Sequence, residues 1–283
     1  MENEIPDTQI AASSPMADAC SVAEPLKQKR PPAQNIPKCV VLAAGASTRL
    51  RPLTDAIPKC LLNVNGKTLL ERTVENVLAA GISEISIVVG YRSEMIGEFV
   101  KRRFPQQRIR LILNPNYAKT NNAYSLLLAR RFLEDENGNV SHPLLLLDSD
   151  VLFSSDLLPS LVQVDAKNKI AVRVLGKHDE EEIRVKVNAN GSIVLIGKDI
   201  PLPEVYGESV GIEIFSSNTA ARLFAVLEQH VRYGAGRTEF YEASFQEMID
   251  SGTELASVDV STFPAIEIDT IDDLERAKQL SMI

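Results

Sequence analysis

Short apolar runs alternate with longer amphipathic stretches along the chain from Lys38 to about residue 176. The apolar runs have the length of β-strands, and they include KCVVLAAG, EISIVVG, IRLIL and PLLLLDSD. Alternation of this kind predicts a parallel sheet with helices on both faces. The four leucines before Asp148 are typical of a central strand that is buried on both of its faces.

The pattern becomes less regular after residue 176. The runs IRVKV and SIVLI, separated by NANG, predict a hairpin because Asn-Gly supplies the positive φ angles of a tight turn. A strand VGIEIF, helices near 217–232 and 240–251, a strand ELASVDV and a closing helix from about Thr270 complete the pattern. We therefore expect an α/β fold: a three-layer α/β/α, Rossmann-like domain with a mixed, mostly parallel sheet and a small β lid at 180–205.

The first 37 residues differ from the rest of the chain. They hold six prolines, show no sustained apolar period and end in the basic patch KQKRPP. Such a segment cannot bury enough apolar surface to offset the entropy of ordering. We predict a flexible N-terminal tail at 1–37 and one domain at 38–283.

Composition excludes several classes of protein. The formal net charge of −8 argues against a nucleic acid partner, which requires a basic face. The three cysteines are too few and too scattered for a zinc cluster or a disulfide framework. No apolar run approaches the roughly 18 residues of a membrane span, and the acidic N-terminus does not resemble a secretory signal. We expect a cytoplasmic protein with no membrane partner.

The strongest local signal is LAAGASTRLRPLTDAIPKCLL at 42–62. It begins where an apolar strand ends, which is where open parallel sheets bind ligands. Its small residues allow a phosphate to approach the backbone N–H groups, and Arg49 and Lys59 add positive charge. A tight strand-to-helix connection is the alternative for the loop. The loop is not a dinucleotide fingerprint, since only Gly45 of G-x-G-x-x-G is present, and GKT at 66–68 is interpreted as a turn and a helix start.

The motifs L-A-A-G-x-S-T-R-L, P-L-T and P-K-x-L-L in this loop resemble the signature of nucleotidyltransferases that act on sugar 1-phosphates and related small phosphoesters. The resemblance implies the nucleotidyltransferase fold, a triphosphate held by the loop and Arg49, and contact between Lys59 and the reacting phosphates. The nucleotide-binding loop residues are Leu42, Ala43, Ala44, Gly45, Ala46, Ser47 and Thr48.

Two segments offer carboxylates at predicted strand ends, LLLLDSDVLF and AIEIDTIDDLERA. Transfer between phosphates needs a divalent ion to offset charge repulsion, and Mg²⁺ prefers carboxylate and phosphate oxygens. By the resemblance, the metal ligands are Asp150, Glu267 and Asp269, with Mg²⁺ as the cofactor. Asp269 has an alternative role as the N-cap of the last helix, which Thr270 would fill equally well.

The stretch NPNYAKTNNAYSLLLAR at 114–130 resembles the cytidylyltransferases that act on phosphocholine and on 2-aminoethylphosphonate. The G-T-A-G-like stretch of sugar-1-phosphate enzymes is absent. The resemblance implies that Asn121, Asn122 and Ser125 lie close to the nucleotide or the acceptor phosphate, and that Gly90 and Tyr91 lie near the base. Capping of a helix is the alternative for the asparagine pair.

The sequence says less about which residues bind the acceptor. A quaternary ammonium is usually held by aromatic faces, and the chain has no Trp, although Tyr206, Tyr233, Phe240 and Tyr241 remain candidates. Glu239 and Glu242 would instead pair with a primary ammonium. Lys186 and Lys198 would meet the acceptor phosphate or be surface lysines of the hairpin. The candidate acceptor-binding residues are Asp148, Lys186, Lys198, Glu208, Tyr241 and Glu242.

We thus expect an enzyme that transfers CMP from CTP to a small phosphate or phosphonate acceptor, with Mg²⁺ and with release of pyrophosphate. The acceptor oxygen is already anionic at neutral pH, so no general base is needed. A sugar-1-phosphate nucleotidyltransferase that uses another NTP and an inactive nucleotide-sensing homologue are the alternatives. The sequence leaves a homodimer open.

Overall fold

The structure is a computed structural model that describes residue 1 and residues 36–174, 182–233 and 238–280. Residues 36–280 belong to one compact unit, Pro32–Ile283. The flexible tail expected at 1–37 lies almost wholly outside the described residues, as does the start of the expected lid.

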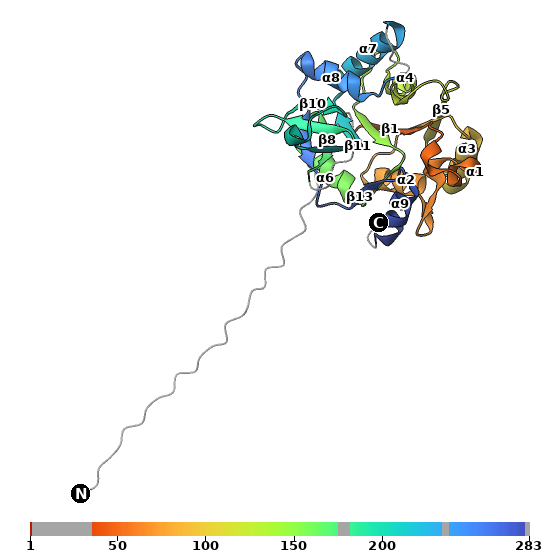
Figure 1. Ribbon diagram of the computed structural model, residues 1–283, viewed down its shortest axis with the longest axis horizontal. Coiled ribbons are helices and arrows are strands. Elements are labelled where there is room, and N and C mark those ends of the chain that lie inside the picture. Colours follow the sequence, from red (N-terminus) through yellow and green to blue (C-terminus); the bar gives the residue numbers. More distant parts are fainter. Residues whose placement is uncertain (2–35, 175–181, 234–237, 281–283) are drawn as a thin grey trace. The chain divides into compact units, whose positions relative to one another are not determined.

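The described residues form a nine-stranded central sheet with the order β10-β9-β11-β6-β1-β4-β5, and β8 and β12 extend from β11. The strands are β1 (Lys38–Ala43), β4 (Ile85–Val89), β5 (Ile109–Leu113), β6 (Leu144–Asp148), β8 (Lys169–Arg173), β9 (Arg184–Val187), β10 (Ile193–Gly197), β11 (Gly207–Phe215) and β12 (Ala256–Asp259). Strands β6, β1, β4 and β5 run parallel, whereas β11 runs antiparallel to β6. The sheet is mixed with a parallel centre, as expected (Figure 1).

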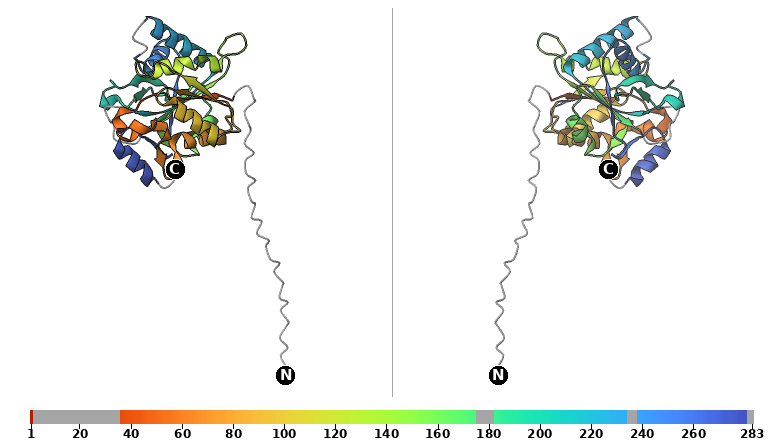
Figure 2. Two further views of the ribbon diagram at one scale, coloured as in Figure 1. Left: turned by 90° about the vertical axis from the view of Figure 1, so that its right-hand side faces the viewer. Right: turned by 90° about the vertical axis from the view of Figure 1, so that its left-hand side faces the viewer.

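Helices cover both faces of this sheet (Figure 2). They are α1 (Leu53–Ala56), α2 (Leu69–Ala79), α3 (Ser93–Arg103), α4 (Asn122–Leu128), α5 (Arg130–Leu133), α6 (Leu157–Gln163), α7 (Ser217–Tyr233), α8 (Glu242–Asp250) and α9 (Ile271–Gln279). Short 3-10 turns occur at η2 (Thr48–Leu50), η3 (Lys59–Leu61) and η4 (Leu202–Glu204). The three-layer α/β/α prediction is confirmed.

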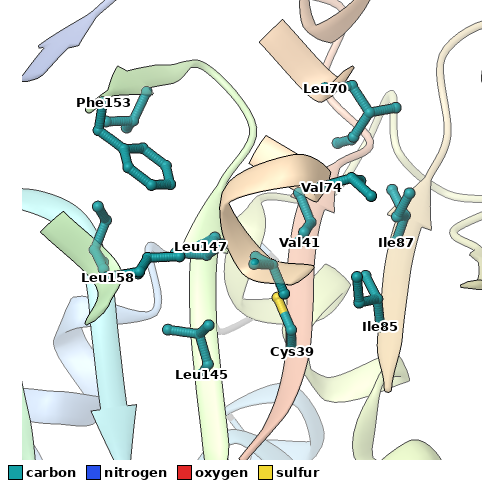
Figure 3. Close-up of a cluster of buried hydrophobic side chains, with 14 of the residues drawn as sticks. Cys39, Val41, Leu70, Val74, Ile85, Ile87, Leu145, Leu147, Phe153 and Leu158 are labelled. Carbon is teal, nitrogen blue, oxygen red and sulfur yellow. The ribbon is translucent and has the colours of Figure 1, made fainter. Parts of the chain in front are cut away.

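Alternate residues of each strand enter opposite cores, because side chains of a strand point to its two faces in turn. Cys39 and Val41 of β1 and Leu145 of β6 pack with α2, α3 and α6 in one core (Figure 3). Val40 and Leu146 pack with α4, α7 and α8 in the other. The leucine run of β6 is fully buried, as predicted for a central strand.

The hairpin predicted near 183–196 is present as β9 and β10, which pair antiparallel. It continues the central sheet, since Val185 and Arg184 of β9 pair with Gly207 and Glu208 of β11. Strand β11 is nine residues long. Its near end pairs with β9 and its far end with β6, and β8 pairs with residues at both ends. The expected lid is therefore one edge of the main sheet.

Two small ladders complete the fold. β7 (Val151–Phe153) pairs with β13 (Ala265–Glu267), and β2 (Asn63–Val64) pairs with β3 (Lys67–Thr68). Gly66 turns between β2 and β3 with φ +89°, and the Thr68 hydroxyl caps α2. The GKT segment is thus a turn and a helix start, as interpreted from the sequence.

Candidate active site

A pocket of about 360 Å³ opens beyond the carboxyl ends of β1 and β6. Parallel sheets place ligands at this edge because the loops after the strands meet there. The loop after β1, the start of α4, the middle of β11, the start of α8 and β13 all contribute to the wall. Residues from parts of the sequence that lie far apart therefore face one cavity.

The loop after β1 forms the wall at one end of the pocket. Leu42, Ala43, Ala44, Gly45, Ser47 and Arg49 line the pocket, whereas Ala46 and Thr48 do not. Ser47 has left-handed backbone angles, φ 46° and ψ 57°, and Thr54 Oγ1 donates to its carbonyl at 2.8 Å. A Cβ on Gly45 would meet nothing within 4 Å, so the backbone of this loop is open to a large anion.

Lys59 is the central cation of the pocket. Its side chain is 6% exposed, and Nζ lies 2.8 Å from Asp150 Oδ2 and 2.6 Å from Asp269 Oδ1. Burial lowers the pKa of Lys59, but the charges of Asp150 and Asp269 outweigh burial and raise it above the usual range. Arg49 Nη2 donates to the other oxygen of Asp269 at 2.7 Å. Both predicted cations therefore meet at Asp269.

The predicted metal ligands also come together. Among the described residues, Asp150, Glu267 and Asp269 offer carboxylate oxygens that all lie within 4.8 Å of one another. Pairing of Glu267 with Val151 in the β7–β13 ladder brings the two segments side by side. Withdrawal from water inside the pocket and the charges of Asp150 and Asp269 raise the pKa of Glu267, although its side chain is exposed at the mouth.

This carboxylate group fits a hard divalent cation. All of its donors are oxygens, the ligands that Mg²⁺ prefers. Oδ1 of Asp150 is buried and accepts no hydrogen bond in the described structure, so one ligand atom is available. Thr270 caps α9 in a capping box with Asp273. The capping alternative for Asp269 is therefore wrong, and its carboxylate faces the pocket.

The asparagine pair lies at the start of α4 and lines the pocket with Ser125. Asn121 caps the helix, since its side chain accepts from the N–H of Asn122 at 2.9 Å. Asn122 Oδ1 accepts from the N–H of Tyr241 at 2.9 Å, and Asn121 Nδ2 donates to the carbonyl of Thr238 at 3.3 Å. The pair therefore joins α4 to the segment that begins α8, and capping and pocket lining are both present.

Gly90 and Tyr91 lie behind the pocket. The Tyr91 N–H donates to the Ala44 carbonyl at 3.0 Å, and a Cβ on Gly90 would lie 2.7 Å from that carbonyl oxygen and 2.6 Å from Tyr117 Cβ. The pair supports the loop and is not among the lining residues. Tyr117 lines the pocket and was not singled out from the sequence, although it belongs to the motif NPNYAKTNN.

The predicted acceptor residues divide into two groups. Asp148, Lys198 and Glu242 line the pocket, and Tyr241 lies directly behind them because its hydroxyl donates to Asp148 Oδ2 at 2.8 Å. Two residues are not brought to the pocket. They are Lys186, which pairs with Glu204 at 2.6 Å, and Glu208, which pairs with Arg173.

Acidic side chains accumulate near the end of the pocket that Asp148, Lys198 and Glu242 line. Glu213 of β11 is 1% exposed and Glu242 is 7% exposed. Burial raises the pKa of Glu242 to about 7, and burial with the charges of Asp148 and Glu242 raises the pKa of Glu213 well above its usual range. Withdrawal from water and the charge of Asp150 likewise raise the pKa of Asp148 well above its usual range. Glu213 was missed from the sequence, where its only signal was an acid inside an apolar strand.

Comparison with known proteins agrees with this geometry. The family "Nucleotidyl transferase" matches residues 38–192. The chain is 43% identical over 96 residues to a choline-phosphate cytidylyltransferase of Streptococcus pneumoniae, a match that covers 34% of this chain and 40% of that relative. It is 27% identical over 242 residues to a 2-aminoethylphosphonate cytidylyltransferase of Lancefieldella rimae, covering 86% and 89%.

A solved structure of an inositol-1-phosphate CTP transferase from T. maritima has the same fold, with a TM-score of 0.70, 22% identity and coverage of 88% and 98%. The chain belongs to the nucleotidyl transferase family. The resemblance found in the sequence, to small-substrate cytidylyltransferases within this family, is confirmed. None of the described helices is both long and apolar enough to cross a membrane.

Proposed function

We propose that this chain is a Mg²⁺-dependent cytidylyltransferase that joins CMP from CTP to a small phosphate or phosphonate acceptor and releases pyrophosphate. The observation that carries the proposal is the placement of Lys59, with its Nζ within 2.8 Å of both Asp150 and Asp269 beside the open loop after β1. A cation, a metal-binding carboxylate group and an anion-binding loop are the parts that phosphoryl-type transfer requires.

The choice of CTP and of a small acceptor is supported by the relatives. The two aligned relatives are named for cytidylyl transfer to choline phosphate and to 2-aminoethylphosphonate, and the structural neighbour is named for inositol 1-phosphate. The three acceptors share a phosphate or phosphonate oxygen, and that oxygen is the nucleophile in the proposed reaction.

In this reaction an anionic oxygen of the acceptor attacks the α-phosphorus of CTP, and the bond to pyrophosphate breaks on the opposite side. Arg49 and Lys59 hold the phosphates and offset the charge that develops on them. Bound Mg²⁺ would supply further charge neutralisation from Asp150, Glu267 and Asp269. Asp150 and Asp269 also fix the Lys59 ammonium in place. Catalysis then rests on positioning and electrostatics.

The test is an assay of pyrophosphate release with Mg²⁺ and each of the four NTPs, crossed with 2-aminoethylphosphonate, phosphoethanolamine, phosphocholine, inositol 1-phosphate and glucose 1-phosphate. Mass spectrometry identifies the nucleotide product. A CDP-linked product supports the proposal. A product only with UTP or dTTP and the sugar phosphate would support the sugar-nucleotide alternative, and nucleotide binding without turnover would support the sensing alternative.

A pair of lysine variants tests the site. We expect Lys59→Ala to lower kcat by at least about a hundredfold, since a preorganised charge on a reacting phosphate contributes on the order of 3 kcal/mol. Lys101→Ala is the matched control, because Lys101 is an exposed lysine of α3 outside the pocket. A folded Lys59→Ala protein with wild-type turnover would refute the assignment.

A further inference from the structure

Two carboxylates near the β11 end of the pocket, Glu242 in its lining and Glu213 outside it, have an oxygen without a hydrogen-bond donor. Oε2 of Glu242 and Oε2 of Glu213 are buried and accept no hydrogen bond from the residues that the structure describes. An unsatisfied buried carboxylate is strongly unfavourable, because desolvation is not offset. Glu242 lines the pocket, so a ligand in the pocket can reach it.

The side chains around these oxygens are mostly acidic. Asp148, which also lines the pocket, interacts electrostatically with Glu242 on one side and with Asp150 on the other. The Ser209 hydroxyl donates to the second oxygen of Glu213 at 3.3 Å, and Ser209 lines the pocket too. The opposing cation is Lys198, whose Nζ lies 5.0 Å from the centroid of the Phe240 ring. Asp148, Glu213 and Glu242 thus interact with one another, and Lys198 is the cation that acts on Glu242.

A second metal ion does not fit this group. Among the described residues, the carboxylates that approach one another closely enough to share an ion are Asp150, Glu267 and Asp269. Asp148, Glu213 and Glu242 do not meet that condition. Carboxylates too far apart to share an ion suit a ligand that donates several N–H groups in different directions, and an ammonium has three such donors.

The topology separates this group from the nucleotide end of the pocket. The open loop follows β1, and Tyr117 packs against Gly90 at the end of β4. Glu213 and Ser209 belong to β11, which lies on the other side of β6 from β1. The metal carboxylate Asp150 follows β6, between the two ends. A ligand at the acidic end is therefore the acceptor, with its phosphate directed toward Asp150 and the other end of the molecule directed away.

From these contacts we propose that the acceptor carries a primary ammonium group, held by Glu242 and Asp148, which line the pocket, and that this group selects the substrate. The inference rests on the proposed function and deepens it. A quaternary ammonium has no N–H to donate, so it would leave Oε2 of Glu242 unsatisfied.

The aromatic groups of this region argue the same way, since a quaternary ammonium requires open aromatic faces. The Tyr241 ring is 1% exposed and packs against Phe245 with centroids 5.1 Å apart. Phe240 is 45% exposed, but the Lys198 ammonium already lies over its ring, 5.0 Å from the centroid. Tyr117, the other aromatic side chain among the described lining residues, lies toward the nucleotide end. The side chain of Tyr233, once a candidate, lies outside the described residues.

The experiment compares matched acceptors with CTP and Mg²⁺ on the full chain. 2-Aminoethylphosphonate and ethylphosphonate differ in the ammonium group, and phosphoethanolamine and phosphocholine differ in the methyl groups on nitrogen. We expect kcat/KM to favour the primary ammonium member of each pair by at least about tenfold, the value of one or more charged hydrogen bonds. Equal use of ethylphosphonate or preference for phosphocholine would overturn the proposal.

A variant of Glu242 tests the role of this one side chain. Glu242→Gln should raise KM for 2-aminoethylphosphonate by at least about tenfold and should affect ethylphosphonate less, so that discrimination within the pair falls. A purely structural role would alter both acceptors alike and would refute the assignment. Glu98→Gln, at an exposed position of α3, is the control that keeps wild-type discrimination.

Failure of the proposed function is distinguishable from failure of this inference. If no acceptor yields a CDP-linked product, the proposed function is wrong. Calorimetric titration of wild-type protein with 2-aminoethylphosphonate and with ethylphosphonate then still decides the inference. Tighter binding of the amine supports the ammonium site, and equal or undetectable binding of both overturns it.

Discussion

The carboxylate of Glu242 should destabilise the folded protein at neutral and alkaline pH. Burial raises its pKa from the ordinary 4.5 to about 7. Below pH 4.5 the carboxyl holds its proton in both the folded and the unfolded chain, so it does not change the free energy of unfolding. As pH rises from 4.5 to about 7, the unfolded chain releases this proton before the folded chain does, so the free energy of unfolding falls. At 1.36 kcal/mol for each pKa unit, the loss reaches about 3 kcal/mol above the folded pKa.

Glu242→Gln removes this ionisation and should therefore stabilise the protein in a pH-dependent manner. We expect a gain of about 3 kcal/mol at about pH 8 and about 1 kcal/mol at about pH 5, from the same relation. Urea unfolding of both proteins at the two pH values, without ligand, measures the difference. Glu98→Gln, an exposed acid of α3, should change the unfolding free energy little at either pH. A Glu242→Gln protein that is less stable by the same amount at both values would refute the reasoning, because the carboxylate would then be stabilised by its contacts.

Three further changes test the supporting structure. Asp150→Asn removes a charge from the metal carboxylates and should raise the Mg²⁺ concentration for half-maximal turnover at least about tenfold; an unchanged Mg²⁺ titration would contradict this. Gly90→Ala places a Cβ 2.7 Å from the Ala44 carbonyl oxygen, so it should lower the free energy of unfolding by about 2 kcal/mol and weaken nucleotide binding. A variant with the unfolding free energy of the wild type would argue against the close contact. Thr270→Ala removes the cap of α9 and should lower the unfolding free energy by about 1 kcal/mol, which chemical denaturation measures directly.

The parts of the site predictable from sequence are those in continuous motifs. The small residues after β1, Arg49 and Lys59 fall within one loop, and Asp150 directly follows an apolar strand. In each case local chemistry decides the role, since a loop at the end of a parallel strand opens on the ligand edge. Glu267 joins them because the E-x-D segment pairs with β7. The resemblance implied its role as a metal ligand, and spacing alone does not give the pairing.

The acceptor end depends on tertiary geometry that the sequence does not encode locally. Gly211 adopts φ +67°, and a Cβ there would lie 2.8 Å from Asp148 Oδ2. The pairing of β11 with β8 shifts between Ser209 and Glu213. Four positions along β11 there oppose two along β8, so β11 carries two extra residues at this point, and Gly211 is one of the residues between the paired positions.

The two lysines of the hairpin are a second case in which the sequence does not decide which side chain faces the pocket. Lys186 lies in β9 and pairs with Glu204 of η4, whereas Lys198 lies just past β10 and reaches the pocket. Their sequence contexts are alike: both are single lysines beside short apolar runs. Which of them faces the ligand depends on how the hairpin joins β11, and that pairing involves residues more than twenty positions apart.

The two ends of the pocket differ in how their charges are satisfied. At the loop end Lys59 meets two carboxylates and Arg49 meets one of them, so the protein neutralises its own charges before substrate arrives. At the β11 end Glu213 and Glu242 keep an oxygen without a donor, and burial raises the pKa of both carboxyl groups. Native proteins rarely leave buried carboxylates unsatisfied, and exceptions concentrate at functional sites. The same unsatisfied oxygen that destabilises the free protein is therefore the feature that makes its pocket selective for an ammonium-bearing acceptor.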